Sequence, residues 1–364
     1  PGVEEKWAEH LGVKHCAAST SGTAAIHVAL GALNLEPGSE VITGPITDMG
    51  TVIPILAQNC IPVFGDLRRD NLGLDAEDVE RRLTERTRAI IPVHLCGNAT
   101  DMDPLMRLAE KYNLYVVEDC SQAYGTLYKG KHVGTIGHMG TFSLQQSKHI
   151  TCGDGGLTVT NDDDLGSRAL LFANKGWPNY GQGERNYVMF GMCYRMTELQ
   201  AAVLDAQIDK VDWVTARRNE LGDMICAALR SFEGLQVPGV SEGGRHTYWF
   251  LPLLVDQKAL GISTTKLAQA LSAEGAPCGA HYIGQPIFMY DLLRQKQVYG
   301  ASNYPYCLQP AGQEVRYEKG ECPVTEAILD DLLQVSVNEK MTDEDVADIV
   351  ACFEKVWENL DELR

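Results

Sequence analysis

The sequence predicts an α/β fold built on a mainly parallel sheet. Short β-rich runs alternate with helical segments through the first 160 of 364 residues, at the spacing of strand–helix–strand units. The runs AIIPVHL (89–95) and LYVVED (114–119) are apolar almost throughout, as expected where helices cover both faces of a sheet. Ligands of such sheets bind beyond the carboxyl ends of the strands, so functional residues are expected just after each strand.

The expected elements follow one another in a regular order along the chain. Strands are predicted at residues 15–19, 40–43, 62–66, 89–95 and 115–118, with helices between them at 22–33, 51–58, 76–83 and 104–112. The next elements are a strand at 157–162, a helix at 162–176 and a long helical segment at 197–229. A Gly- and Pro-rich stretch then indicates a boundary. We predict a large domain over residues 1–240 and a smaller α+β domain over residues 241–364, with a strand at 247–255 and helices at 264–275 and 342–360.

The charge and the cysteines exclude several classes of protein. Thirty-one Lys and Arg against 49 Asp and Glu give a net charge of −18, so neither nucleic acid nor an anionic membrane is an expected partner. No apolar run is long enough for a transmembrane helix. The 11 cysteines form no CxxC pair and have no zinc spacing, so we expect reduced thiols, no metal and a cytoplasmic location.

Two polar segments follow the first and fifth predicted strands. In STSGTAA (19–25), Gly22 lets the backbone approach an anion and Thr23 offers a hydroxyl at a helix N-terminus. A simple Ser or Thr helix cap is the alternative. In VVEDCSQA (116–123), Asp119 and Gln122 come at the carboxyl end of the strand. An aspartate that caps a helix is the alternative there, so each segment alone leaves two interpretations open.

Two later segments place a basic residue among small and polar ones. Lys148 lies with Ser143 in TFSLQQSKHITCGDGG (141–156), where a surface lysine in a loop is the alternative. Arg195 lies in GMCYRMTELQAA (191–202). The alternative for that segment is a helix start with Thr197 as N-cap and Gln200 completing a capping box.

Taken together, these segments resemble one enzyme family. SGTAA, PVFGD, VHLCG, VVEDCSQAYG, GTFSLQQSKHITCGDGG, YRMTELQAA and CPVTE occur in the order typical of the DegT/DnrJ/EryC1/StrS sugar aminotransferases. The resemblance covers nearly the whole chain and implies a pyridoxal 5'-phosphate enzyme of fold type I. It also implies a seven-stranded, mostly parallel sheet with a smaller C-terminal domain, and a homodimer with active sites at the subunit interface.

The resemblance assigns a role to each candidate residue. Lys148 matches the lysine that forms an imine with the cofactor aldehyde, Asp119 the partner of the pyridine nitrogen, and Gln122 the residue beside the ring. The phosphate cradle is matched by Gly22, Thr23 and Ser143. A lysine at this position favours transamination, from Glu or Gln through pyridoxamine phosphate to a nucleotide-linked keto-sugar or a keto-cyclitol. The alternatives are a sugar dehydratase or lyase, and a non-catalytic regulator that binds the cofactor.

The sequence departs from the family pattern in places that concern the substrate. Cys193 stands where the family usually has an Asn that reaches the partner's cofactor phosphate, a contact that Arg195 could supply instead. Met49 lies in the loop where the family often places an aromatic residue over the ring, although a simple loop methionine is the alternative. His281 and Tyr282 lie in the segment expected to border the substrate. A dinucleotide enzyme is excluded because no GxGxxG follows the first strand.

Overall fold

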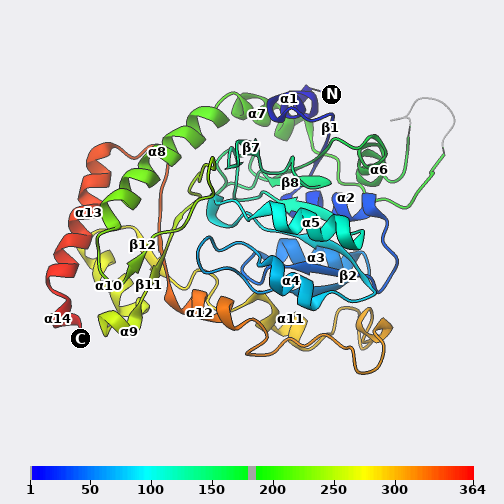
Figure 1. The fold of residues 1–364 in the computed structure, drawn as a ribbon. Helices are drawn as coiled ribbons and strands as arrows, with labels where there is room; N and C mark the ends of the chain where they lie inside the picture. Colours follow the sequence, from blue (N-terminus) through cyan, green and yellow to red (C-terminus); the bar gives the residue numbers. More distant parts are fainter. Residues whose placement is uncertain (1, 179–185) are drawn as a thin grey trace.

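The computed structural model describes residues 2–178 and 186–364, which form two larger β-sheets and one two-stranded sheet, with helices packed around them (Figure 1). The strands of the larger sheet are β1 (His15–Ser19), β2 (Glu40–Thr43), β3 (Ile61–Phe64), β4 (Thr87–Ile91), β5 (Tyr115–Asp119), β8 (Met139–Ser143) and β9 (Gly156–Thr160). The helices of this part are α1 (Gly2–Leu11), α2 (Gly22–Leu33), α3 (Met49–Ala57), α4 (Ala76–Arg82), α5 (Met102–Tyr112), α6 (Asp163–Ala173) and α7 (Glu198–Ile208). A hairpin, β6 (Leu127–Tyr128) and β7 (Lys131–His132), and a 3-10 turn, η1 (Leu95–Gly97), complete it.

In the described chain the larger sheet has seven strands in the order β1-β9-β8-β5-β4-β2-β3. Each pairing from β8 to β3 is parallel, whereas β9 is antiparallel to both of its neighbours, β8 and β1. The predicted α/β class with a mostly parallel seven-stranded sheet is confirmed. Predicted strands 15–19 and 40–43 and predicted helix 22–33 match β1, β2 and α2 in both bounds.

The strands are apolar throughout because both faces of the sheet are covered. In Figure 1, α4 and α5 lie in front of the sheet and α2 and α3 behind it. Neighbouring residues of one strand therefore enter different cores. Val116 packs in the core that contains residues of α4 and α5, and Val117 packs in the core that contains residues of α2, α3 and α6.

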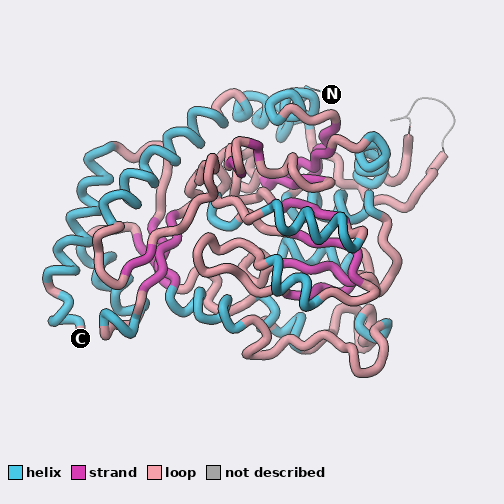
Figure 2. Tube along the Cα trace, viewed as in Figure 1, coloured by secondary structure: helices cyan, strands magenta, loops and turns pink. Residues whose placement is uncertain are grey.

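The second sheet is antiparallel and lies apart from the first (Figure 2). Its order is β10 (Leu235–Gln236), β11 (Leu251–Val255), β13 (Leu332–Val335) and β12 (Cys278–Ala280). Its core is completed by α8 (Val211–Leu229), α10 (Thr264–Glu274) and α13 (Asp343–Glu358). Shorter elements are α9 (Gln257–Leu260), η2 (Ile287–Met289), α11 (Asp291–Arg294), η3 (Tyr306–Leu308), α12 (Pro323–Asp331) and α14 (Leu360–Leu363).

The second sheet begins with β10, before residue 241. Part of the later chain also returns to the first sheet, since Phe288 and Tyr306 pack in one core with Val52 of α3 and Phe64 of β3. The division of the chain at residue 240 stays a prediction.

Most of the other predicted elements differ in their bounds by a few residues, as where predicted strand 89–95 is β4 (Thr87–Ile91). Two predicted elements differ for a reason that the packing shows. Residues 197–229 form two helices rather than one, because α7 packs on α1 whereas α8 packs on α13, and the chain turns between them at Asp209. Thr197 and Gln200 do form the capping box of α7. Predicted strand 247–255 starts only at Leu251, since Thr247 and Trp249 bond through their backbone N–H groups to Gly97 and Cys96 instead. Within residues 2–178 and 186–364, every helix is too short or too polar to cross a bilayer.

Candidate active site

A cleft with a volume of about 340 Å³ opens at the carboxyl ends of β5 and β8. It is lined by the catalytic and cofactor-binding residues expected from the sequence, and by one of the four expected substrate residues: Gly22, Thr23, Asp119, Gln122, Ser143, Lys148 and Tyr282. The residues before position 150 meet because the strands that precede them end at the same edge of the larger sheet. Tyr282 comes from the segment after β12 of the second sheet.

One wall of the cleft is the N-terminus of α2. Ser21 caps this helix and accepts a hydrogen bond from the N–H of Ala24 at 3.0 Å. The first N–H groups of a helix lack intrahelical acceptors, so this end attracts anions. A Cβ built on Gly22 would lie 2.6 Å from Cβ of Ser143, so only glycine allows the two segments to approach this closely. The hydroxyls of Thr23 and Ser143 line the same hollow.

Asp119 ends β5, and its side chain is 3% exposed. One carboxylate oxygen accepts from the hydroxyl of Thr51 at 2.7 Å, and the other accepts from the N–H of Ser121 at 3.0 Å. Each oxygen keeps a lone pair for a further donor. A turn follows β5, so Asp119 does not cap a helix. The carboxylate is thus fixed in the cleft wall and can bind a cationic N–H.

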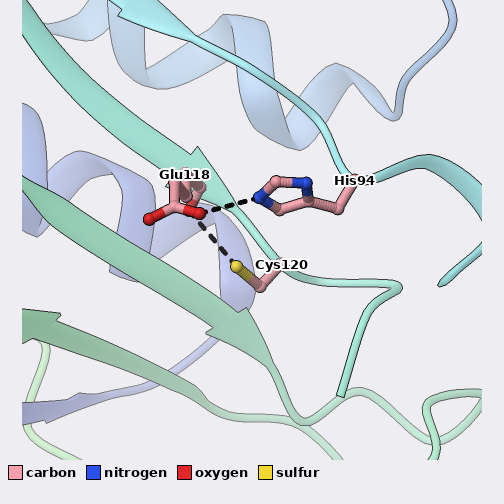
Figure 3. Close-up of side chains that lie close together, drawn as sticks. All are labelled: His94, Glu118 and Cys120. Carbon is pink, nitrogen blue, oxygen red and sulfur yellow. Dashed lines mark hydrogen bonds and ion pairs between the residues drawn. The ribbon is translucent and has the colours of Figure 1, made fainter. Parts of the chain in front are cut away.

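Glu118 points to the opposite face of β5, where it meets His94 and Cys120 (Figure 3). His94 accepts from the N–H of Thr100 at Nδ1, so its Nε2 carries the proton and donates to Glu118 at 3.0 Å. The carboxylate of Glu118 also accepts three backbone N–H groups, from Gly134, Ile136 and Gly137. The imidazole and the carboxylate are therefore already engaged, which identifies the cluster as a hydrogen-bond network rather than a metal site.

Lys148 lies in the loop after β8 and is partly buried. Burial lowers the pKa of its amine below the ordinary value, while the nearby carboxylates of Asp119 and Asp48 oppose this shift. The ring centroid of Trp249 lies 4.3 Å from Nζ. A lowered pKa increases the neutral fraction of the amine, which is the form that attacks a carbonyl.

Gln122 connects two parts of the chain. Its Oε1 accepts from the N–H of Cys96 at 2.8 Å, and its Nε2 donates to the phenol oxygen of Tyr282 at 3.2 Å. Burial raises the pKa of Tyr282, so this phenol stays neutral and keeps a proton to donate. The second half of the chain thus contributes to the cleft formed by the first half.

Comparison with known proteins shows to which family the chain belongs. The model of the DegT/DnrJ/EryC1/StrS aminotransferase family matches residues 2–307. The chain belongs to this family. It is 38% identical to the GDP-perosamine synthase of Caulobacter vibrioides over 267 residues, covering 72% of this chain and 70% of the relative. It is 32% identical over 373 residues to a Micromonospora echinospora protein assigned as an L-glutamine:3-amino-2,3-dideoxy-scyllo-inosose aminotransferase, covering 99% of this chain and 86% of the relative.

The crystal structure of an aminotransferase from Psychrobacter cryohalolentis has the same fold. It matches with a TM-score of 0.86 and 29% identity, over 99% of this chain and 91% of that one. The protein is therefore a pyridoxal-phosphate-dependent aminotransferase of fold type I. The cleft fits this cofactor, since it offers an amine for an aldehyde, a buried carboxylate for a protonated ring nitrogen, and a helix N-terminus with two hydroxyls for a phosphate.

Three of the expected substrate residues lie outside the cleft of this aminotransferase. Met49 packs on the core that contains Val52 and Phe288. The guanidinium of Arg195 donates to Asn174 at 2.6 Å and borders a separate cavity of about 850 Å³. The imidazole of His281 bonds to the hydroxyl of Thr265 and the carbonyl of Leu329.

Several residues that line the cleft were not predicted from the sequence, and Asp48 and Trp249 are two of them. Asp48, directly before Met49, lines the cleft. Its carboxylate caps α3 by accepting a hydrogen bond from the N–H of Gly50 at 2.7 Å. The sequence contains a local indication of this capping role, because Asp and Asn are preferred N-cap residues directly before a helix. Trp249 lies in what reads as a continuous strand, and no local signal in the sequence connects it with Lys148.

Proposed function

We propose that the protein transfers an amino group from glutamate or glutamine to the ketone of a sugar or cyclitol, with Lys148 as the reacting amine. The observation that carries this proposal is the meeting of three groups in one cleft: the Lys148 amine, the Asp119 carboxylate and the N-terminus of α2. Bound there, pyridoxal phosphate supplies an aldehyde that binds amines and a ring that accepts electrons from the carbon being deprotonated.

Each cleft residue of this chain has its own role in the proposed reaction. The neutral amine of Lys148 accepts a proton from Cα of the amino donor and delivers it again as a general base and acid. Asp119 binds the ring N–H and keeps it protonated, since its fixed negative charge favours the cationic form. Gly22, Thr23 and Ser143 hold the phosphate through N–H and hydroxyl groups. Gln122 lies beside the ring, and the neutral phenol of Tyr282 faces the substrate.

The charge that one chain contributes to the cleft favours an uncharged acceptor. Among the described residues that line it, the charged side chains are Asp48, Asp119, Asp154 and Lys148. A nucleotide diphosphate needs cations, whereas the hydroxyls of a keto-cyclitol need only donors and acceptors. The relative assigned to an inosose supports this acceptor class. A nucleotide-linked keto-sugar is the second candidate, supported by the identity to GDP-perosamine synthase.

We propose a homodimer as the working assembly. Large apolar side chains are exposed on and before α7, including Phe190 at 75% and Leu199 at 82%. Exposed large apolar side chains that are close in the sequence support a protein–protein contact at this segment. Arg195 lies in the same segment, and in a dimer it would take over the phosphate contact that Cys193 cannot make.

The free cysteines support a cytoplasmic location. A mass measurement in solution and cell fractionation test the two statements.

An absorbance titration tests the proposed reaction. The purified protein with pyridoxal phosphate should show a visible band that glutamate or glutamine bleaches, and a keto-cyclitol should restore it. K148A should show no such band and no transfer. A band that neither donor bleaches would contradict transamination and favour a regulator. Restoration by nucleotide-linked keto-sugars alone would select the second acceptor class.

A further inference from the structure

Trp249 is placed to control the amine of Lys148. We infer that Trp249 is a positioning residue, whose ring holds the free amine in place and keeps water from one side of it. This inference rests on the proposed role of Lys148. It concerns the stage of the reaction at which the amine is not bound to the cofactor and must carry a proton.

The contacts on both sides of Lys148 come from one short segment. Nε1 of Trp249 donates to the carbonyl of Ser147 at 2.8 Å, one residue before Lys148. Nε2 of His149, one residue after it, lies 3.0 Å from the carbonyl of Thr247. These two hydrogen bonds bracket the lysine, and the indole face lies over Nζ with the centroid 4.3 Å away. Trp249 is partly buried and lines the cleft, so it is not simply a core residue.

The segment that carries Trp249 is itself held on both sides. The backbone N–H of Trp249 donates to the carbonyl of Cys96 at 2.8 Å. Arg218 of α8 is buried beside this segment. Its guanidinium donates to the carbonyl of Tyr248 at 3.3 Å and to that of Val337 at 2.9 Å. It also forms an ion pair with Glu339. Tyr248 has a φ of +43°, a conformation that side chains other than glycine adopt at a cost. The indole is thus presented by a backbone that the surrounding structure fixes.

The ring stabilises the charged form of the amine. An aromatic face attracts an ammonium within about 6 Å, more strongly where water is excluded. After Lys148 has taken a proton from the substrate carbon, the ammonium needs a partner that does not remove the proton. An indole face meets this need because it offers electrostatic attraction without a basic atom.

Competitive labelling of the full chain, freed of cofactor, tests the inference. Acetic anhydride is applied across a range of pH, and the acetylation of Lys148 is mapped by mass spectrometry to give its pKa. W249F keeps a ring face, whereas W249L keeps only apolar bulk, and both lack the indole N–H. We expect the pKa of Lys148 in W249L to lie about one unit below that in W249F, and W249F to stay close to wild type.

A matched control and a second variant keep the test decisive. W213L changes a tryptophan of α8 that is 59% exposed and should leave Lys148 unchanged. W249M replaces W249L if circular dichroism shows that the leucine variant is unfolded. Equal pKa values in the phenylalanine and aliphatic variants would overturn the inference. Borohydride reduction of the loaded wild type separates this from failure of the proposed function, since a label on another residue would reject Lys148 itself.

Discussion

The phenol oxygen of Tyr282 accepts a hydrogen bond from Nε2 of Gln122 at 3.2 Å, although 160 residues separate them in the chain. The bond connects the segment after β12 to the segment after β5. The backbone of Tyr282 has a φ of +46° and that of His281 a φ of +64°, both in the left-handed region. Two successive residues in this conformation are costly, and strain of this kind clusters at functional sites.

Removing this phenol should weaken the reaction without unfolding the protein. Y282F deletes one hydrogen bond of about 1 kcal/mol, so kcat/KM for the acceptor should fall roughly fivefold. Y115F, which changes a tyrosine that is 37% exposed at the start of β5, is the matched control. Steady-state kinetics with both variants decides, and an unchanged kcat/KM in Y282F would remove Tyr282 from the site.

The charge of Asp119 should matter more than its shape. D119N keeps the size, and its one oxygen can still accept from the N–H of Ser121, but it loses the negative charge opposite the ring nitrogen. A charge-assisted hydrogen bond contributes about 1.5–3 kcal/mol, so kcat/KM should fall about 100-fold. Wild-type kinetics in D119N would show that the ring nitrogen lies elsewhere.

Gly22 should be essential for binding the cofactor phosphate. In G22A the new Cβ would lie 2.6 and 2.8 Å from Cβ and Oγ of Ser143, so one wall of the cradle must move. Overpacking of this kind costs about 1–3 kcal/mol, and the Kd for pyridoxal phosphate should rise about 10- to 100-fold. G2A is the control, because a Cβ there meets nothing within 4 Å. Equilibrium dialysis gives both constants, and equal values would reject the cradle.

Buried imidazoles behind Lys148 should make stability depend on pH. Burial lowers the pKa of His149 and of His246 from 6.5 to about 3. Between these values the unfolded chain binds more protons than the folded one, so the free energy of unfolding falls as the pH falls below about 6.5. The loss is about 2 kcal/mol per imidazole at pH 5. Urea unfolding at pH 7 and pH 5 measures it, and H149Q should lose less than wild type; an equal loss would show that His149 does not titrate in this range.

The order of the motifs along the chain, through the resemblance to the family, pointed to Gly22, Thr23, Asp119 and Gln122. Each local pattern alone left a simple helix cap open as the alternative. Trp249 was missed because its relation to Lys148 is made only by tertiary contacts across 101 residues of chain. The imidazole of His281 could not be placed either, since its backbone conformation turns the side chain toward Thr265.

The proposed reaction depends first on the amine of Lys148, which we propose binds the cofactor aldehyde. Borohydride reduction of the protein loaded with pyridoxal phosphate, followed by peptide mapping, identifies the residue that does so. We predict one stable cofactor label per chain, on Lys148, and none when an amino donor is added before the reductant. A label on a different lysine, or an unlabelled chain that still binds the cofactor, would contradict the account.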